Sequence, residues 1–125
     1  MQTFTSQKWY YAEYQSFIID SEEKWYALHV SGYSGDAGDS LSNTTLDSLL
    51  QQNGMNFSSY DCDNDKKLTG SCAVSNGAAW WFGNCIYSCL TCVYGSNTFV
   101  WPSLDTYGFE SMGKLKAARM MIKSI

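Results

Sequence analysis

The stretch Asp61-Cys62-Asp63-Asn64-Asp65, followed by Cys72 and then by Trp80-Trp81 just before Cys85, is the most informative part of this chain. Its carboxylates stand at alternate positions, close to a pair of cysteines. Hard cations such as calcium take several oxygen ligands, and alternating Asp residues in an irregular loop can supply them from one side. The stretch therefore predicts a metal-binding surface loop. The alternative is an ordinary solvated turn, because Asn and Asp are common turn residues.

The spacing excludes an EF-hand. That motif needs Gly at its sixth position and a bidentate Glu at its twelfth. Counted from Asp61, those positions hold Lys66 and Cys72. A calcium site in this stretch would therefore have a different loop architecture.

The composition describes one packed domain. The chain has 125 residues, of which 16% are aromatic and 16% charged, which favours a packed fold over disorder. The net charge is −4 and there is no basic run, so nucleic acid is not an expected partner. No run of eighteen apolar residues occurs, so no membrane span is expected. The first eight residues lack the apolar core of a signal peptide.

Five cysteines leave an odd thiol, either free or bonded to another chain. Cys89 and Cys92 have the spacing of a redox CxxC, but no helical pattern follows them, which disfavours catalysis. A zinc site would draw on Cys72, Cys85, Cys89 and Cys92, whose spacing matches no standard zinc ribbon. An additional surface disulfide, or inert buried thiols, is the simpler alternative.

Hydrophobic patterning predicts a hairpin near the N-terminus. Residues 9–19 are rich in aromatic and β-branched side chains, residues 20–24 form a polar turn, and residues 25–30 alternate. His29 is the only histidine, and its place in the second strand favours a structural role. Residues 31–43 are expected to form a loop. Residues 44–52 predict a short helix that Gly54 stops, and residues 112–125 are rich in helix-forming side chains.

The order of several motifs resembles the C-terminal domain of fibrinogen-related proteins, a family that includes the ficolins, the tachylectins and invertebrate fibrinogen-related lectins. The motifs are residues 53–61, Cys72-Ala73, Trp80-Trp81, Asn84-Cys85 and, upstream, residues 35–40. The resemblance implies an α+β fold: a short twisted antiparallel sheet, a small helix and a long loop-rich subdomain that binds calcium and ligand. Residues 1–125 would form a partial domain, truncated at its N-terminal side.

The resemblance also bears on the C-terminus. It implies that residues 119–123 form a strand that returns to the central sheet, although local propensity favours a helix. We expect the strand, with a helical turn possible at residues 114–118. A sheet that lacks neighbouring strands exposes an edge, which invites pairing with other chains. A free cysteine offers a second route to such a partner.

The same resemblance implies a calcium site and a disulfide. The side chains of Asp63 and Asp65 match the family's calcium ligands, and two backbone carbonyls complete the set. Counting from Asp65 gives the carbonyls of Lys67 and Thr69, and counting back from Cys72 gives those of residues 68 and 70. The implied disulfide joins Cys72 to Cys85.

A ligand pocket for acetyl groups is implied beside this loop, at an unusual cis peptide bond that corresponds here to Asn84–Cys85. Two positions depart from the family: Ile86 replaces a His, and Asn76 replaces a Tyr. Trp101 is one of several aromatic residues that could line the pocket, whereas core packing is expected for Trp80 and Trp81. Because a donor and an aromatic wall are lost, binding of N-acetylated sugars is expected to be weak or absent.

These features predict a secreted, calcium-stabilised recognition module that binds carbohydrate or acetylated surface groups in innate recognition. The alternative is a structural or protein-interaction domain that has lost sugar binding. An enzyme is the least favoured class, because no nucleophile–base set or phosphate loop is present. Sequons occur at Asn43 and Asn56, and Asn43, in the expected loop, is the predicted glycosylation site.

Overall fold

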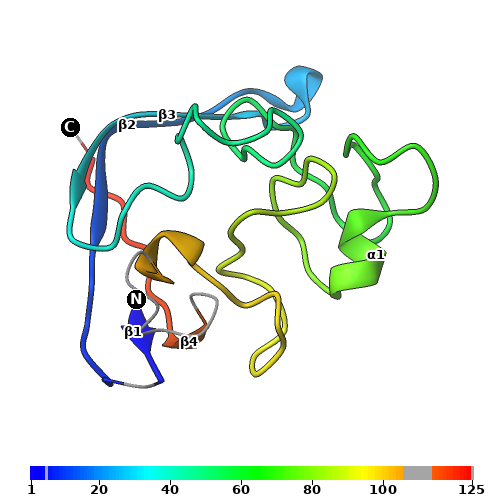
Figure 1. The fold of residues 1–125 in the computed structure, drawn as a ribbon. Coiled ribbons are helices and arrows are strands. Elements are labelled where there is room, and N and C mark those ends of the chain that lie inside the picture. The colour runs from blue at the N-terminus through cyan, green and yellow to red at the C-terminus, as the bar shows by residue number, and fades with distance from the viewer. Residues whose placement is uncertain (5, 106–113, 125) are drawn as a thin grey trace.

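The computed structural model describes residues 1–4, 6–105 and 114–124. Its elements, in chain order, are β1 (Gln2–Thr3), β2 (Ala12–Ile19), the 3-10 turn η1 (Glu22–Lys24), β3 (Leu28–Gly35), α1 (Cys72–Asn76), the 3-10 turn η2 (Pro102–Asp105) and β4 (Leu115–Ala117). Figure 1 shows the β2–β3 hairpin along one side, with α1 at the opposite end from β1 and β4. Long irregular segments connect these elements, as an α+β, loop-rich fold requires.

Strands β2 and β3 form the predicted antiparallel hairpin, with Tyr14 opposite Tyr33 and Phe17 opposite Val30. A regular strand would place Tyr14 and Phe17 on opposite faces, yet both pack against the core. The irregularity coincides with Gly32, which has φ of 72° and a backbone that passes close to Gln15. The hairpin therefore contributes both aromatic rings to the interior.

The predicted second strand, residues 25–30, is wrong at both ends. Trp25 and Tyr26 have φ of 54° and 52°, a left-handed conformation that ends η1 and cannot continue a strand. The strand begins at Leu28 and runs on to Gly35, into residues that the sequence assigned to a loop. Turn geometry, rather than the alternation of side chains, sets its beginning.

The C-terminal strand lies earlier in the chain than predicted. Strand β4 pairs antiparallel with β1, and no strand or helix occurs at residues 118–124. The predicted strand at residues 119–123 and the helical turn at residues 114–118 are therefore both wrong. Leu115 is only 1% exposed and its N–H donates to the Phe99 carbonyl, so tertiary burial selects the strand. Residues 112, 113 and 125 of the segment rich in helix-forming side chains lie outside the described residues.

The predicted helix at residues 44–52 is also wrong, because this segment forms consecutive turns. The Asn43 side chain accepts from the Thr45 N–H, and the Asp47 side chain accepts from the Leu49 N–H. Such local side-chain bonds compete with the helical hydrogen-bond pattern. The segment ends at Gln52, whose side chain is fully buried and holds Ser88 through a 3.1 Å hydrogen bond.

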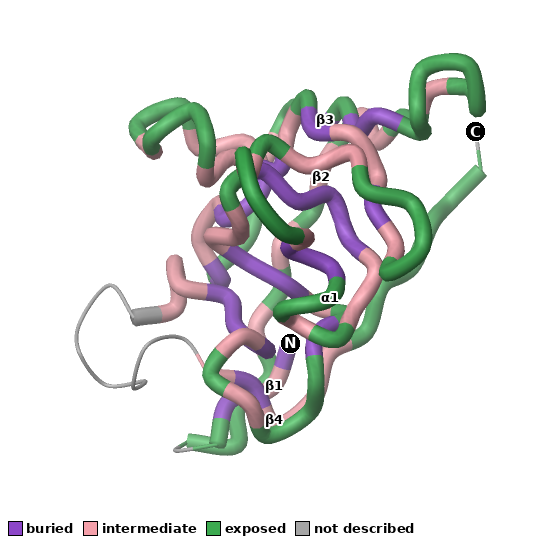
Figure 2. The backbone as a smooth tube through the Cα atoms, turned by 90° about the vertical axis from the view of Figure 1, so that its right-hand side faces the viewer, coloured by how far each residue is buried: buried purple, intermediate pink, exposed green. Residues whose placement is uncertain are grey.

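The largest fully buried side chains are aromatic, and buried chain runs through the middle of the molecule (Figure 2). Trp80 and Phe82 are at most 1% exposed. Trp81 packs edge-on against Phe17, Phe57 and Trp80, and its indole N–H donates to the Tyr26 carbonyl at 3.0 Å. The prediction that the two tryptophans form core is confirmed. Burial of both rings fixes the segment that leads to Cys85.

Candidate metal loop and ligand-binding site

The alternating carboxylates lie in a surface loop that they hold together. Asp63 accepts from the Asp65 N–H at 3.2 Å. The two oxygens of Asp65 accept from the N–H groups of Lys67 and Cys72, both at 2.7 Å. Asp63 is exposed and Asp65 is half-buried. The Asp65 side chain thus ties the loop to the first residue of α1.

The loop is anchored on buried chain. The Asn64 N–H donates to the Ser58 hydroxyl, and the Asn64 amide donates to the Phe57 carbonyl, both at 2.9 Å. Ser58 is fully buried and pairs with Trp80 in a short antiparallel bridge. The core therefore sets the position of the carboxylates.

The donor chemistry of the loop fits calcium. Within the described part of the chain, no carbonyl of residues 63–70 accepts a hydrogen bond. Each carboxylate oxygen retains a lone pair beyond the bonds it accepts. No three His, Cys, Asp or Glu side chains of the described residues gather into a metal cluster. A cage here would therefore combine the carboxylates of Asp63 and Asp65 with loop carbonyls, either those of Lys67 and Thr69 or those of residues 68 and 70.

Two disulfides account for four of the five cysteines. Cys72 is bonded to Cys85, the pairing that the resemblance implied, and Cys89 is bonded to Cys92. Cys62 is the free and exposed thiol. The zinc alternative is wrong because its four thiols are used in these bonds. Cys89 is fully buried and no helix begins there, so the CxxC pair has the environment of a structural bond.

Helix α1 was missed by the sequence analysis, although both its ends carry recognisable signals. The Ser71 hydroxyl accepts from the Val74 N–H, and Gly77 ends the helix in a left-handed conformation. Five residues are too few to show helical periodicity. Asn76 is the last residue of the helix, and its side-chain amide donates to the Cys72 carbonyl at 2.8 Å within the helix.

The peptide bond Asn84–Cys85 is cis, as the resemblance implied. The Asn84 N–H donates to the Leu49 carbonyl at 2.7 Å, and the Cys85 carbonyl accepts from the Gly83 N–H at 2.9 Å. Neither the Cys85 N–H nor the Ile86 N–H donates to another described residue. These two N–H groups are the candidate donors to a ligand oxygen, and the half-buried Ile86 side chain packs against the core beside them.

Trp101 does not belong to this site. It is 1% exposed, and its indole N–H donates to the Gly38 carbonyl at 3.0 Å. The prediction that its ring lines a ligand pocket is therefore corrected: Trp101 is a core residue that holds the 35–40 segment.

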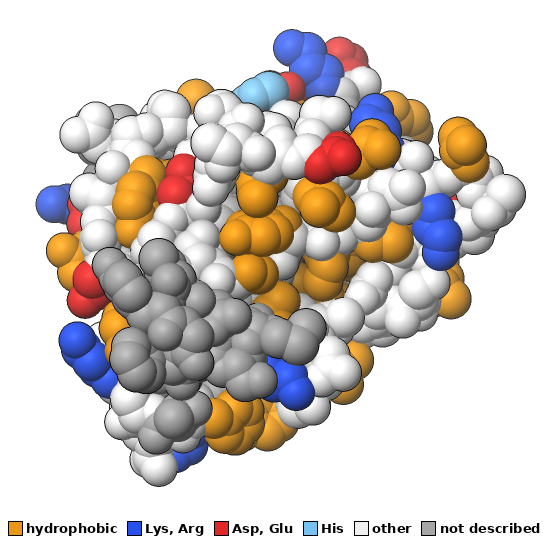
Figure 3. Space-filling view, in the orientation of Figure 1, with side chains coloured by type: hydrophobic (Ala, Val, Ile, Leu, Met, Phe, Trp, Pro, Cys, Tyr) orange, Lys and Arg blue, Asp and Glu red, His pale blue; other side chains and the backbone are white. Residues whose placement is uncertain are grey.

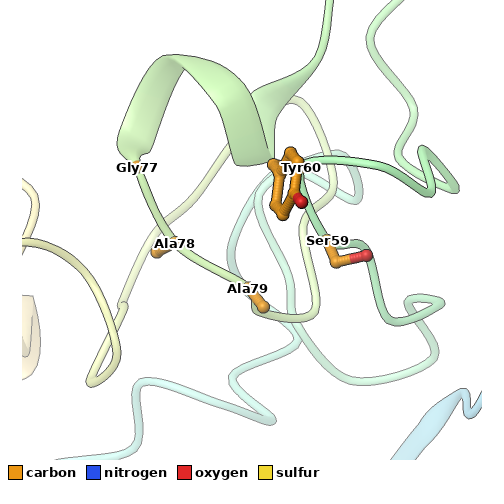
Figure 4. Close-up of a pocket in the computed structure, with 5 residues that line it drawn as sticks. All are labelled: Ser59, Tyr60, Gly77, Ala78 and Ala79. Carbon is orange, nitrogen blue, oxygen red and sulfur yellow. The ribbon is translucent and has the colours of Figure 1, made fainter.

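A pocket of about 390 Å³ lies at the C-terminal end of α1, and none of the residues predicted to bind ligand is among those that line it. Figure 4 shows Tyr60 beside the chain that leaves the helix. The lining residues are Ser59, Tyr60, Gly77, Ala78 and Ala79. The sequence analysis missed this pocket, whose one visible signal is an aromatic residue within a polar turn.

The remaining predicted positions lie on the surface. The side-chain Oδ1 of Asn43 accepts from the Thr45 hydroxyl at 2.7 Å in a partly exposed turn. His29 lies on β3 and its ring contacts the Asp20 carboxylate at 2.8 Å, which agrees with a structural role. Figure 3 shows hydrophobic side chains across the middle of one face, with Lys and Arg mostly towards its rim.

The β2–β3 hairpin, the Cys72–Cys85 disulfide and the carboxylate loop define the class of domain, and comparison with known proteins agrees. The chain belongs to the family described as fibrinogen beta and gamma chains, C-terminal globular domain, which matches residues 1–124. It is 40% identical over 84 residues to Techylectin-5A of Tachypleus tridentatus, covering 67% of this chain and 26% of that protein. It is 37% identical over 119 residues to human Angiopoietin-4, covering 92% of this chain and 22% of that protein.

Among solved structures, the chain is similar to the lamprey fibrin D-dimer in complex with the peptide ligand Gly-His-Arg-Pro-amide. The TM-score is 0.62 at 32% identity, covering 77% of this chain and 32% of that one. The chain spans about a quarter of the length of the two curated relatives named above. None of the helices among the described residues is long and apolar enough to cross a membrane.

Proposed function

We propose that this domain is an extracellular, calcium-stabilised recognition module that binds N-acetylated sugars or similar acetylated surface groups weakly, in innate recognition. The observation that carries the proposal is the pair of unused N–H donors at Cys85 and Ile86, held by a disulfide next to the carboxylate loop. Binding, rather than catalysis, is the role that this set of groups can serve.

Calcium would organise the loop and take no part in chemistry. Asp65 links the loop to Cys72 through a 2.7 Å hydrogen bond, and Cys72 is linked to Cys85. A cation held by Asp63 and Asp65 would therefore stiffen the segment that presents the donors. The site would lose ligand affinity when calcium is removed, because part of the ordering would then have to occur on binding.

The ligand chemistry follows from the groups present. An acetamido group offers a carbonyl oxygen to the Cys85 and Ile86 N–H groups, and its methyl can contact the Ile86 side chain. A small set of hydrogen bonds of about 1 kcal/mol each supports binding on the millimolar scale, about −4 kcal/mol. The lectin Techylectin-5A among the relatives supports the choice of glycans as ligands.

A glycan array probed with and without a calcium chelator tests this proposal. We expect weak, calcium-dependent signals on N-acetylated glycans displayed at high density, where multivalent contact raises the apparent affinity. Equal signals in calcium and chelator would reject the calcium role. Absence of all signal would favour the second candidate function.

That second candidate is a protein-interaction domain, and the free sheet edge favours it. The outer edge of β2 makes no backbone hydrogen bond to any described residue beyond the hairpin, whereas residues 53–57 cover part of β3. Near the C-terminus, Met121 and Ile122 are 81% and 78% exposed. Residues 114–125 carry four of the eight Lys and Arg residues and no acid, which leaves a net charge of −8 on the residues before them.

The partner in this second candidate is another copy of the chain, whose cationic, apolar tail would add to the edge of β2. Light scattering after size-exclusion chromatography gives the mass. A dimer is expected, and Arg119→Glu with Lys123→Glu should shift it to monomer, because the charge attraction is reversed. Lys8→Glu with Lys24→Glu reverses the same charge elsewhere and should leave the dimer. A monomer at every concentration would reject this candidate.

A further inference from the structure

The turn that follows Ser58 displays an aromatic ring to solvent. Ser59 and Cys62 close the turn through two backbone hydrogen bonds, Ser59 N–H to the Cys62 carbonyl at 3.0 Å and the reverse at 3.2 Å. Tyr60 at the tip is 79% exposed. The Ser59 hydroxyl donates to Asp61 at 2.7 Å, which fixes the turn further. An aromatic side chain held in solvent by a rigid turn is a candidate contact surface.

The floor of the pocket beside this ring consists of small residues in fixed positions. Gly77 adopts the left-handed conformation that ends α1, and the Ala78 N–H donates to the Ala73 carbonyl at 3.2 Å. The Ala79 carbonyl accepts from the Thr91 hydroxyl at 2.6 Å. Figure 4 shows Ala78 and Ala79 on the chain that leaves the helix, with open space between Ala78 and the Tyr60 ring. Because these side chains are small, the ring keeps an open space in front of it.

The polarity of the pocket restricts the class of ligand. Its five lining residues carry no charge. The Tyr60 hydroxyl, the Ala78 carbonyl and the Ala79 N–H form no hydrogen bond with another described residue. An apolar ring face with donors and acceptors around it suits a molecule with one apolar face and several hydroxyl groups. A neutral pyranose has that chemistry, whereas an anionic ligand would find no cation in the lining.

We propose that this Tyr60 pocket binds a neutral pyranose unit of a glycan, as a contact separate from the donors at Cys85 and Ile86. The sugar ring would stack on Tyr60 and hydrogen-bond to the backbone of Ala78 and Ala79. The inference rests on the proposed function for its ligand class, since it treats the domain as a glycan-binding module. It adds a subsite that needs neither an acetyl group nor calcium.

NMR titration with the methyl pyranosides of glucose, galactose and mannose, which carry no acetyl group, tests the pocket in chelator. At least one sugar should shift the ring signals of Tyr60 and the amide signals of Gly77, Ala78 and Ala79. Tyr60→Ala should weaken this binding by about two- to tenfold, the range that aromatic contacts provide. Ala78→Leu, which fills the space in front of the ring, should weaken it as well. Tyr94→Ala removes an aromatic side chain of similar exposure outside the pocket and should have no effect.

The inference is overturned if none of the three sugars moves the pocket signals, or if Tyr60→Ala binds as well as the unmodified chain. Titration with N-acetylglucosamine in calcium separates this failure from failure of the proposed function. Shifts at the Cys85 and Ile86 amides alone would keep the proposed function and reject the pocket. Shifts at the pocket alone would keep the pocket and reject the proposed function.

Discussion

At the scale of single residues, Asp39 shows how one carboxylate organises a loop. Its side chain accepts from the Tyr14 hydroxyl at 2.7 Å and from the Leu41 and Ser42 N–H groups at 3.1 and 2.8 Å. The Ser42 hydroxyl donates to its second oxygen at 2.6 Å. Burial raises the pKa of Asp39, but the hydrogen bonds from Ser42, Tyr14 and Leu41 outweigh it, and the net shift lowers the pKa below 3.8.

Acid should therefore destabilise the domain through Asp39. The Asp39 carboxylate binds a proton less readily in the folded state than in the unfolded state. The stability that its hydrogen bonds contribute is therefore present above pH 3.8 and is lost as the pH falls through the lowered pKa of the folded state. Urea unfolding followed across this range should show Asp39→Asn with lower stability near neutral pH and a shallower loss in acid. Ser42→Ala should give part of the effect. An unchanged acid dependence in Asp39→Asn would contradict this account.

At the same scale, the proposed acetyl recognition would depend on Ile86 and Asn76. The Ile86 side chain carries no donor, and the Asn76 amide already uses one of its two N–H groups on the Cys72 carbonyl. Replacing both with the residues that the wider family carries, Ile86→His with Asn76→Tyr, adds a donor and an aromatic wall. We expect N-acetylglucosamine to bind about thirtyfold more tightly, because one hydrogen bond and one aromatic contact each contribute about 1 kcal/mol, about 2 kcal/mol together.

NMR titration of both forms measures the change. Asn76→Tyr alone serves as a partial control, since it restores the wall without the donor. Tight binding by the unmodified chain, or no gain in the double variant, would show that other groups determine affinity.

At the scale of elements, Gly83 joins three segments of the site. Its carbonyl accepts from the Lys66 N–H of the carboxylate loop, and its N–H donates to the Cys85 carbonyl. A Cβ at this position would overlap the Leu49 carbonyl oxygen, which itself accepts from Asn84. The absence of a side chain is therefore what allows the loop, the 44–52 turns and the disulfide to meet.

Gly83→Ala should destabilise the domain by about 1–3 kcal/mol, the usual cost of overpacking, because backbone must move to admit the methyl group. Denaturant unfolding measures the loss. Gly54→Ala is the control: its methyl would meet no atom within 4 Å, and its cost, about 1 kcal/mol, arises from left-handed backbone alone. If Gly83→Ala costs no more than the control, close approach at this position is not a constraint.

The elements also show what the sequence could and could not predict. Alternation of apolar residues predicted the hairpin, and the motif order predicted the Cys72–Cys85 pairing. Helix propensity gave the wrong prediction at residues 44–52, where hydrogen bonds from side chains to the local backbone favour turns. It also gave the wrong prediction at residues 114–118, where the burial of Leu115 selects a strand. Helix α1 is too short for periodicity, and Trp101 could not be distinguished from a surface aromatic without its tertiary contacts.

At the scale of the whole molecule, the proposed function would rest on coupling between a rigid core and irregular loops. Trp80 and Trp81 fix the chain before the disulfide, the disulfide fixes α1, and Asp65 fixes the carboxylate loop to α1. The Tyr60 turn follows directly from buried Ser58. Every proposed contact with a ligand or a cation therefore lies within a few residues of a buried anchor, which limits the ordering that binding must impose.

The most direct test of the central claim is thermal unfolding of the unmodified chain in calcium and in chelator. With calcium at one hundred times its dissociation constant, stabilisation should be about 2.7 kcal/mol, or about 10 °C for a domain of this size. Asp63→Ala with Asp65→Ala should unfold earlier in both conditions, because Asp65 also caps the loop, but should gain nothing from calcium. Asp61→Ala should keep the full gain. Equal melting temperatures of the unmodified chain in calcium and chelator, or a retained gain in the double variant, would contradict the account.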